Sequence, residues 1–130
     1  MGAVLTFEVS LPYRSLGQNS RGHWRKKHGP TALYREEAAL VAASAMRAQG
    51  WTPPARATVT LEYGTKGGRT VGRYQPRDEA NAIDAFKAGY DGLVDAGVVA
   101  DDSRKHLHIG GATISNTWGP RVRVRVEAGE

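Results

Sequence analysis

The last regular segment of the chain alternates strictly between arginine and valine. Residues 121–126 read Arg-Val-Arg-Val-Arg-Val. Because successive side chains of a strand point to opposite faces, this segment predicts a strand with one exposed and one buried face. Arg121, Arg123 and Arg125 would share the exposed face, and the valines would face a core. Any fold for this chain must therefore contain a sheet with a hydrophobic core on one side.

Two other segments have helical periodicity. Residues 31–49 are rich in alanine, and Gly50 follows as a C-terminal stop. The segment from about residue 80 to residue 96 carries a stripe of apolar side chains at steps of three and four, and Gly97 follows as its stop. The stripe consists of Ile83, Phe86, Tyr90, Leu93 and Val94. We expect one continuous helix in each segment.

The remaining apolar segments are typical of strands. Residues 3–11, 55–63 and 105–115 are rich in β-branched and apolar side chains, and 121–128 completes the set. The glycine-rich turn 64–70 favours a short hairpin partner at 70–74. The order of elements predicts one α+β domain, residues 1–130, in which a small mixed sheet packs against two main helices.

Composition narrows the class of protein. With 130 residues and 40% hydrophobic side chains, the chain is large enough to bury a core. The absence of cysteine excludes disulfides and thiolate metal sites, and it suits a reducing compartment. No apolar run approaches the roughly 18 residues of a spanning helix, and the start does not resemble a secretory signal. We expect a soluble cytoplasmic protein without a membrane partner.

The positive charge is gathered in three segments. The formal net charge is +5. Residues 13–35 and 66–77 each hold several cations, and the arginines of 121–125 form the third group. Each group alone is compatible with an ordinary solvated surface, but the three together indicate a polyanion partner. The candidate contacts of the first two groups are Arg14, Arg21, His23, Trp24, Arg25, Lys26, Lys27, Lys66, Arg69, Arg73 and Arg77, with His23 and Trp24 as candidates to stack on a base or ribose.

Carboxylates flank the expected helix 80–96. Asp78 and Glu79 precede it, and Asp101 and Asp102 follow it. Asp78 is well placed simply to cap the helix, and the second pair is compatible with a plain turn. Oxygen ligands without sulfur are also what Mg²⁺ and Mn²⁺ prefer, and these ions catalyse phosphodiester cleavage. Both interpretations remain open on the residues alone.

Two alternative sites are not supported. His106 and His108 share a strand face, which suits zinc, but no third ligand is evident. The segment "GTKGGRT" (64–70) lacks the spacing of a nucleotide-binding phosphate loop.

A longer pattern joins the two acidic pairs. It runs from Arg77, Asp78 and Asn81 through Lys87 and "DGLVDAG" (91–97) to the pair at 101–102. This pattern resembles the RusA-type Holliday-junction resolvases, small homodimeric endonucleases of phages and prophages. Their signature is R-D-x-D-N, a helix with a lysine, D-G-L-x-D-A-G, and a closing D-D. The early "LPYRSLGQNSRGHW" (11–24) also resembles the family, so the likeness extends over most of the chain.

The resemblance implies cleavage of Holliday junctions or related branched DNA, in recombination, repair or phage DNA processing, with Mg²⁺ as cofactor and Mn²⁺ as an alternative ion. It implies that Asp78 and Asp102 are metal ligands, that Asp101 is a further member of the catalytic cluster, and that Lys87 contacts the phosphate. It also adds Asn19 to the candidate DNA contacts. The second aspartate of the signature falls at Ala80, which cannot bind metal. Glu79, as a substitute ligand, and Asp84 are the acids placed to compensate.

Three further expectations follow. The chain forms a homodimer, and because a helix over 80–96 would be about 24 Å long, helices paired antiparallel across the dyad would bring Asp78 of one subunit near Asp102 of the other. Ala80 favours an alternative function, a catalytically weak or inactive protein that binds branched DNA. An RNA-binding domain is a third possibility, but it would carry aromatic side chains along a strand face, and the aromatic residues here are scattered.

Overall fold

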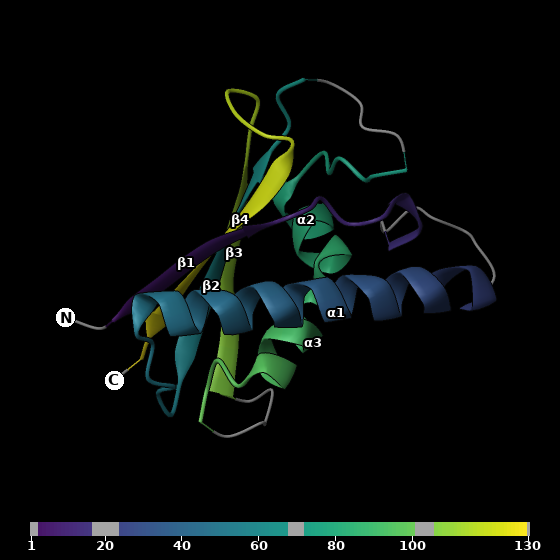
Figure 1. Cartoon of the computed structure of the whole chain (residues 1–130). Helices are drawn as coiled ribbons and strands as arrows, with labels where there is room; N and C mark the ends of the chain where they lie inside the picture. The colour runs from purple at the N-terminus through teal and green to yellow at the C-terminus, as the bar shows by residue number, and fades with distance from the viewer. Residues whose placement is uncertain (1–2, 17–23, 68–71, 101–105, 130) are drawn as a thin grey trace.

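The computed structural model describes residues 3–16, 24–67, 72–100 and 106–129, and for 24–28 the main chain alone. It confirms a single α+β domain with a mixed sheet (Figure 1). The strands are β1 (Val4–Val9), β2 (Ala57–Gly64), β3 (Leu107–Ser115) and β4 (Arg121–Ala128), and the helices are α1 (Trp24–Gln49), α2 (Glu79–Ala85) and α3 (Lys87–Ala96), with a 3-10 turn η1 at Arg14–Leu16. None of the helices within the described ranges is both long and apolar enough to cross a membrane.

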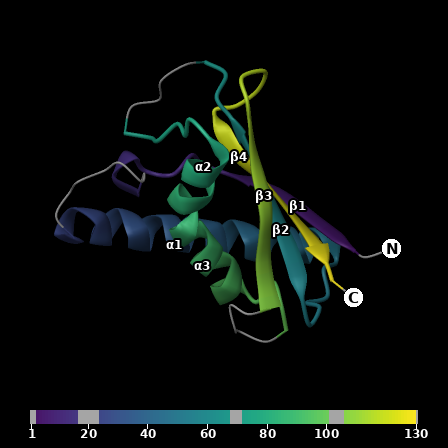
Figure 2. The same cartoon turned by 180° about the vertical axis from the view of Figure 1, so that it is seen from behind.

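The sheet has the strand order β1-β4-β2-β3. β4 pairs antiparallel with β1 and with β2, whereas β2 and β3 run parallel. The helices lie on one side of the sheet, as both views show (Figure 1, Figure 2). The chain therefore forms two layers, with one face of the sheet left without a helix among the described residues.

The alternation in β4 gives the strand one buried and one exposed face, as predicted. Val122, Val124 and Val126 are completely buried, and the arginines between them are exposed. β4 lies between two strands, so its valines occupy the middle of the core face. Burying a valine side chain contributes roughly 1.5–3 kcal/mol. The buried valines belong to the core cluster that also contains residues of the helices.

Helix α1 begins earlier than predicted. It starts at Trp24 rather than Thr31 and passes through Gly29 and Pro30. Proline inside a helix loses one main-chain hydrogen bond. The helix accommodates Pro30 at that cost, and a Cβ on Gly29 would have no neighbour within 4 Å. The basic residues at 25–27 consequently belong to the first turns of a helix and not to a loop.

The expected single helix over 80–96 is two helices. The break falls at Phe86, which has φ −87° and ψ 4° and closes α2 with hydrogen bonds to Asp84 and Ile83. Its side chain is completely buried and packs edge-on against Tyr34, with 6.0 Å between ring centroids. Periodicity did not reveal the break because both halves keep the same helical repeat. The break directs the Phe86 ring into the core.

The described residues of the segment 70–74 do not form the expected hairpin strand. Residues 70 and 71 lie outside the described residues. Arg73 forms an isolated antiparallel bridge with Tyr13 instead of pairing with β2. Main-chain bonds of 2.8 Å join Arg14 to Gly72 and Tyr74 to Pro12 on either side of it. This connection holds the loop after β2 against the end of β1.

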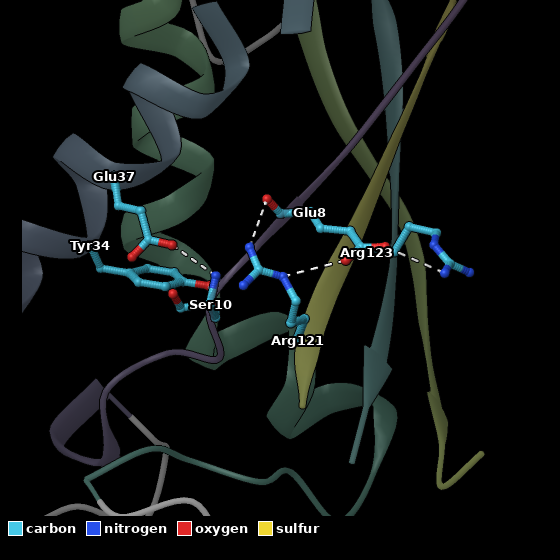
Figure 3. A network of polar contacts seen from close by, with 6 residues as sticks. All are labelled: Glu8, Ser10, Tyr34, Glu37, Arg121 and Arg123. Carbon is cyan, nitrogen blue, oxygen red and sulfur yellow. Dashed lines mark hydrogen bonds and ion pairs between the residues drawn. The ribbon is translucent and has the colours of Figure 1, made fainter. Parts of the chain in front are cut away.

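Side chains from the helices occupy both edges of the sheet. At the β1 edge, the Gln49 amide accepts from Thr6 N at 3.2 Å and donates to Thr6 O at 2.6 Å. Ser10 N donates to Glu37, and the Tyr34 hydroxyl donates to Ser10 O, both at 2.7 Å (Figure 3).

The β3 edge has a similar cover. The Tyr90 hydroxyl donates to the main-chain oxygen of Leu107. A carboxylate oxygen of Glu79 accepts from Ala112 N at 3.4 Å. Each edge thus has main-chain groups satisfied within the chain.

Helix α3 approaches α1 closely at Gly92. A Cβ there would overlap the main-chain oxygen of Arg35 and lie 2.9 Å from Ala38 Cβ. Ala88, Gly89, Gly92 and Leu93 form the buried face of α3. Small residues, rather than the larger apolar stripe alone, therefore set the distance between the two helices.

We predict that Gly92→Ala lowers the free energy of unfolding by about 1–3 kcal/mol, because the added methyl group overpacks the contact. Gly29→Ala is the matched control. It lies in an open position of α1 and should leave stability unchanged or raise it by up to about 1 kcal/mol. Urea unfolding of the three proteins tests this, and equal stability of Gly92→Ala and wild type contradicts the close contact.

Candidate functional site

The arginine row of β4 is neutralised by carboxylates. Arg121 lies 3.3 Å from Glu8, Arg123 lies 2.9 Å from Glu62, and Arg125 pairs with Glu127 in its own strand (Figure 3 shows the pairs of Glu8). Such exposed pairs contribute only ~0.2–1 kcal/mol each. Their larger effect is on the surface charge, because each arginine is balanced by a glutamate. The helix-free face is therefore a poorer polyanion surface than the sequence indicated.

The first two basic segments do meet, in a hollow of about 620 Å³. Arg14 comes from η1, and Arg73 and Arg77 come from the loop before α2. Thr65, which follows β2, and Ile114, near the end of β3, form another part of the wall. The hollow therefore lies at the carboxyl ends of the parallel pair, which is where open α/β sheets commonly bind ligands. We call it the arginine pocket; its remaining lining residues are Tyr74, Gln75 and Pro76.

Arg73 is held rigidly in the wall of the pocket. Its guanidinium donates to Leu11 O at 2.9 Å and lies 4.1 Å from the centre of the Tyr13 ring. Tyr13 in turn contacts Tyr34 edge-on, at 6.3 Å between centroids. A fixed positive charge is thus connected through aromatic contacts to the buried core.

Arg14 and Arg77 differ from the paired arginines of the surface. Both are exposed, and neither forms an ion pair with an acid of the described residues. Arg35, by comparison, is bound by both oxygens of Asp95, and this contact raises the pKa of its guanidinium. Two guanidinium groups in the pocket are therefore not neutralised by any acid within the described ranges.

Asp78 caps helix α2. Its Oδ1 accepts from Asn81 N at 2.9 Å, and its Oδ2 accepts from the Asn81 side chain at 3.3 Å. The capping interpretation of Asp78 is therefore confirmed. The carboxylate is nevertheless exposed, and it directly follows Arg77 of the pocket. Capping orients the carboxylate without enclosing it.

The two candidate compensating acids are placed differently. Glu79 is exposed at the first turn of α2 and is tied to β3 through Ala112 N. Asp84 is exposed at the far end of the same helix. Burial raises the pKa of the Tyr74 hydroxyl, and the charges of Asp78 and Asp84 raise it further while Arg77 opposes them. Asp78 and Asp84 therefore act electrostatically on one residue that lines the arginine pocket.

The other predicted residues are only partly described. Lys87 is the exposed first residue of α3, and Lys66 is exposed beyond the end of β2. Ala80 is also exposed, so the place of the missing aspartate faces solvent. Within the described ranges there is no cluster of three His, Asp or Glu residues that could hold a metal ion. Asn19, Arg21, His23, Arg69, Asp101 and Asp102 lie outside the described residues, as do the side chains of Trp24, Arg25, Lys26 and Lys27.

The arginine pocket was not foreseen as a unit. Its arginines were candidates, but Thr65, Tyr74, Gln75, Pro76 and Ile114 were not. No local pattern of the sequence marks them, because the pocket depends on the parallel pairing of β2 and β3, which brings residues 65 and 114 to one end of the sheet.

Comparison with models of known protein families and with curated proteins finds no match to this chain.

The capping contact of Asp78 generates a stability prediction. Asp78→Ala should lower the free energy of unfolding by about 1 kcal/mol, whereas Asp78→Asn should leave it nearly unchanged because asparagine caps about as well as aspartate. Chemical denaturation of the two variants beside wild type measures the difference. If both variants lose the same stability, the negative charge and not the cap is what contributes.

Proposed function

We propose that the protein is a cytoplasmic, divalent-metal-dependent endonuclease that cleaves Holliday junctions or related branched DNA. The observation that carries the proposal is the adjacency of the arginine pocket and the exposed carboxylate of Asp78. A phosphate bound by Arg77 would lie next to the place where a metal ligand is needed. The resemblance of residues 77–102 to the RusA-type resolvases supports the same reading.

The donor set fits Mg²⁺ or Mn²⁺. Asp78, Glu79 and Asp102 supply carboxylate oxygens, which are the ligands these hard ions prefer. When bound, the ion would activate a water molecule and neutralise charge on the phosphodiester. In this proposal Asp101, next to Asp102 in the sequence, is a further acid of the site, and Lys87 and the pocket arginines would hold the DNA phosphates. The basic groups reduce the repulsion that a cluster of carboxylates otherwise exerts on a polyanion.

A homodimer is part of the proposal, because cuts on both sides of a junction require two sites. A site shared between subunits would require a straight helix of about 24 Å over residues 80–96. The expectation of one straight helix is wrong, since the chain breaks at Phe86. The dimer therefore rests on the resemblance alone. The mass in solution by light scattering tests it, and a monomer at working concentration would remove this part of the proposal.

Ala80 supports a second candidate function. A signature aspartate is replaced there by a side chain without oxygen, and Glu79 is partly engaged by its bond to Ala112 N. A protein that binds branched DNA but cuts it weakly or not at all would have this composition. The two functions share the DNA-binding surface and differ in the completeness of the metal site.

The enzyme reading predicts that labelled four-way junctions are cut in Mg²⁺ or Mn²⁺ and left intact in EDTA. Asp102→Asn should abolish cutting while preserving junction binding, because it removes a proposed metal ligand and some repulsion of phosphate. Arg125→Ala, on the neutralised face, is the control and should cut normally. Cutting by Asp102→Asn at the wild-type rate contradicts the assigned ligand, and tight binding without cutting by wild type supports the second candidate.

The departure at Ala80 gives a separate prediction. Ala80→Asp should increase the cleavage rate and lower the Mg²⁺ concentration needed for half-maximal rate, because it restores an oxygen ligand. Glu79→Gln is the companion variant, since it keeps an acceptor for Ala112 N but removes the charge. Loss of activity in Glu79→Gln, with no gain in Ala80→Asp, would identify Glu79 as the substitute ligand. No change in either variant contradicts the alignment with the resolvase signature.

A further inference from the structure

The arginine pocket has two kinds of wall. Arg14, Arg73 and Arg77 supply guanidinium groups, which bind phosphate oxygens with paired hydrogen bonds. Tyr74, Pro76 and Ile114 supply a ring and aliphatic surface. No acid lines the pocket among the described residues. A ligand that fits must combine an anion with a flat or apolar body.

The size of the pocket also limits its ligand. Its volume, about 620 Å³, falls within the ~300–1,000 Å³ of sites that enclose small molecules. A DNA duplex offers phosphates on its outside but keeps its bases stacked inside. To place a base in a hollow, an enzyme must act on an unpaired strand or extrude the nucleotide at a cost in stacking energy. The cost is least where the strand is already unpaired.

The rigidity of one wall favours a defined binding geometry. Arg73 is fixed by Leu11 O and by the Tyr13 ring, so its charge is already in place before a ligand binds. Arg14 and Arg77 form no ion pair with an acid of the described residues. Tyr74 keeps its hydroxyl proton to a higher pH than a free tyrosine, because burial and then Asp78 raise its pKa. The pocket is thus organised to receive a phosphate without rearranging ion pairs.

We propose that the arginine pocket binds one unpaired nucleotide of a DNA strand, with its phosphate against Arg14 and Arg77 and its base against Tyr74, Pro76 and Ile114. The proposal takes its partner, DNA, from the proposed function. It adds the device by which branched DNA is distinguished from continuous duplex, namely recognition of a nucleotide that has left the stack. The phosphate on the other side of that nucleotide then lies toward Asp78.

The test is binding of fluorescent oligothymidylate, of an abasic oligomer of equal length and of duplex DNA, followed by anisotropy in EDTA. Wild type should bind oligothymidylate at least about fivefold more tightly than the abasic oligomer, as one stacked base provides. Tyr74→Ala should abolish this ratio, and Tyr74→Phe, which keeps the ring, should preserve it. Arg14→Ala should weaken both oligomers and reduce the salt slope by about 0.7.

Two more variants serve as a second test of the pocket and as a control. Ile114→Trp fills the pocket from a position that is 37% exposed, so it should abolish the same ratio without loss of a buried contact. Arg125→Ala removes a paired arginine on the open face and should change neither affinity nor ratio. Circular dichroism and thermal unfolding confirm that each variant is folded.

The proposal is overturned if wild type binds the abasic oligomer as tightly as oligothymidylate, or if folded Ile114→Trp and Tyr74→Ala keep the wild-type ratio. The outcome is independent of cleavage because EDTA is present throughout. If wild type binds oligothymidylate more tightly than the abasic oligomer but leaves junctions intact in Mg²⁺, the nucleotide pocket is supported and the nuclease is rejected. If wild type cuts junctions but binds both oligomers equally, the nuclease is supported and the nucleotide pocket is rejected.

Discussion

The Tyr34 side chain connects the parts of this fold that otherwise have no direct link. Its ring is completely buried and contacts both Tyr13 and Phe86 edge-on. Its hydroxyl donates to Ser10 O beyond the end of β1, and burial raises its pKa, so the proton stays in place. Helix α1, the end of β1 and the junction of α2 with α3 are therefore held at one point. The arginine pocket is connected to the same point, because Tyr13 also contacts the guanidinium of Arg73.

The distribution of charge separates the two surfaces of the molecule. On the helix-free face, glutamates of β1, β2 and β4 neutralise the arginine row. In the arginine pocket, Arg14 and Arg77 keep their charge. A small hollow lined by one sign of charge concentrates the electrostatic field more than a flat mixed surface does. Among the described residues, the hollow thus brings the unpaired Arg14 and Arg77 together with Arg73.

Local patterns in the sequence predicted the strands and their buried faces. The alternation of residues 121–126 identified β4 and its buried face, and the described strands agree with the predicted ones to within about two residues. Tertiary packing decided the rest. The helical path is interrupted at Phe86, whose ring is buried against Tyr34. Helix α1 continues through Pro30 despite the lost bond. The pairs of Glu8 and Glu62 with arginines require the strand order, and the pocket requires residues 14, 65, 77 and 114 to meet. Asp78 was predicted as a helix cap and, alternatively, as a metal ligand. The cap is confirmed by its bonds to Asn81, and the ligand role stays a prediction.

The occupied sheet edges limit how copies of this protein can assemble. An open edge is a template on which a further strand, and eventually a fibre, can grow. Here a strand approaching β1 meets the Gln49 amide on Thr6 and the side chains bound to Ser10, and one approaching β3 meets Glu79 and Tyr90. Growth by strand addition would first have to displace these helical side chains. Any stable association of two copies is therefore expected to form face to face, giving a closed pair rather than an extending sheet.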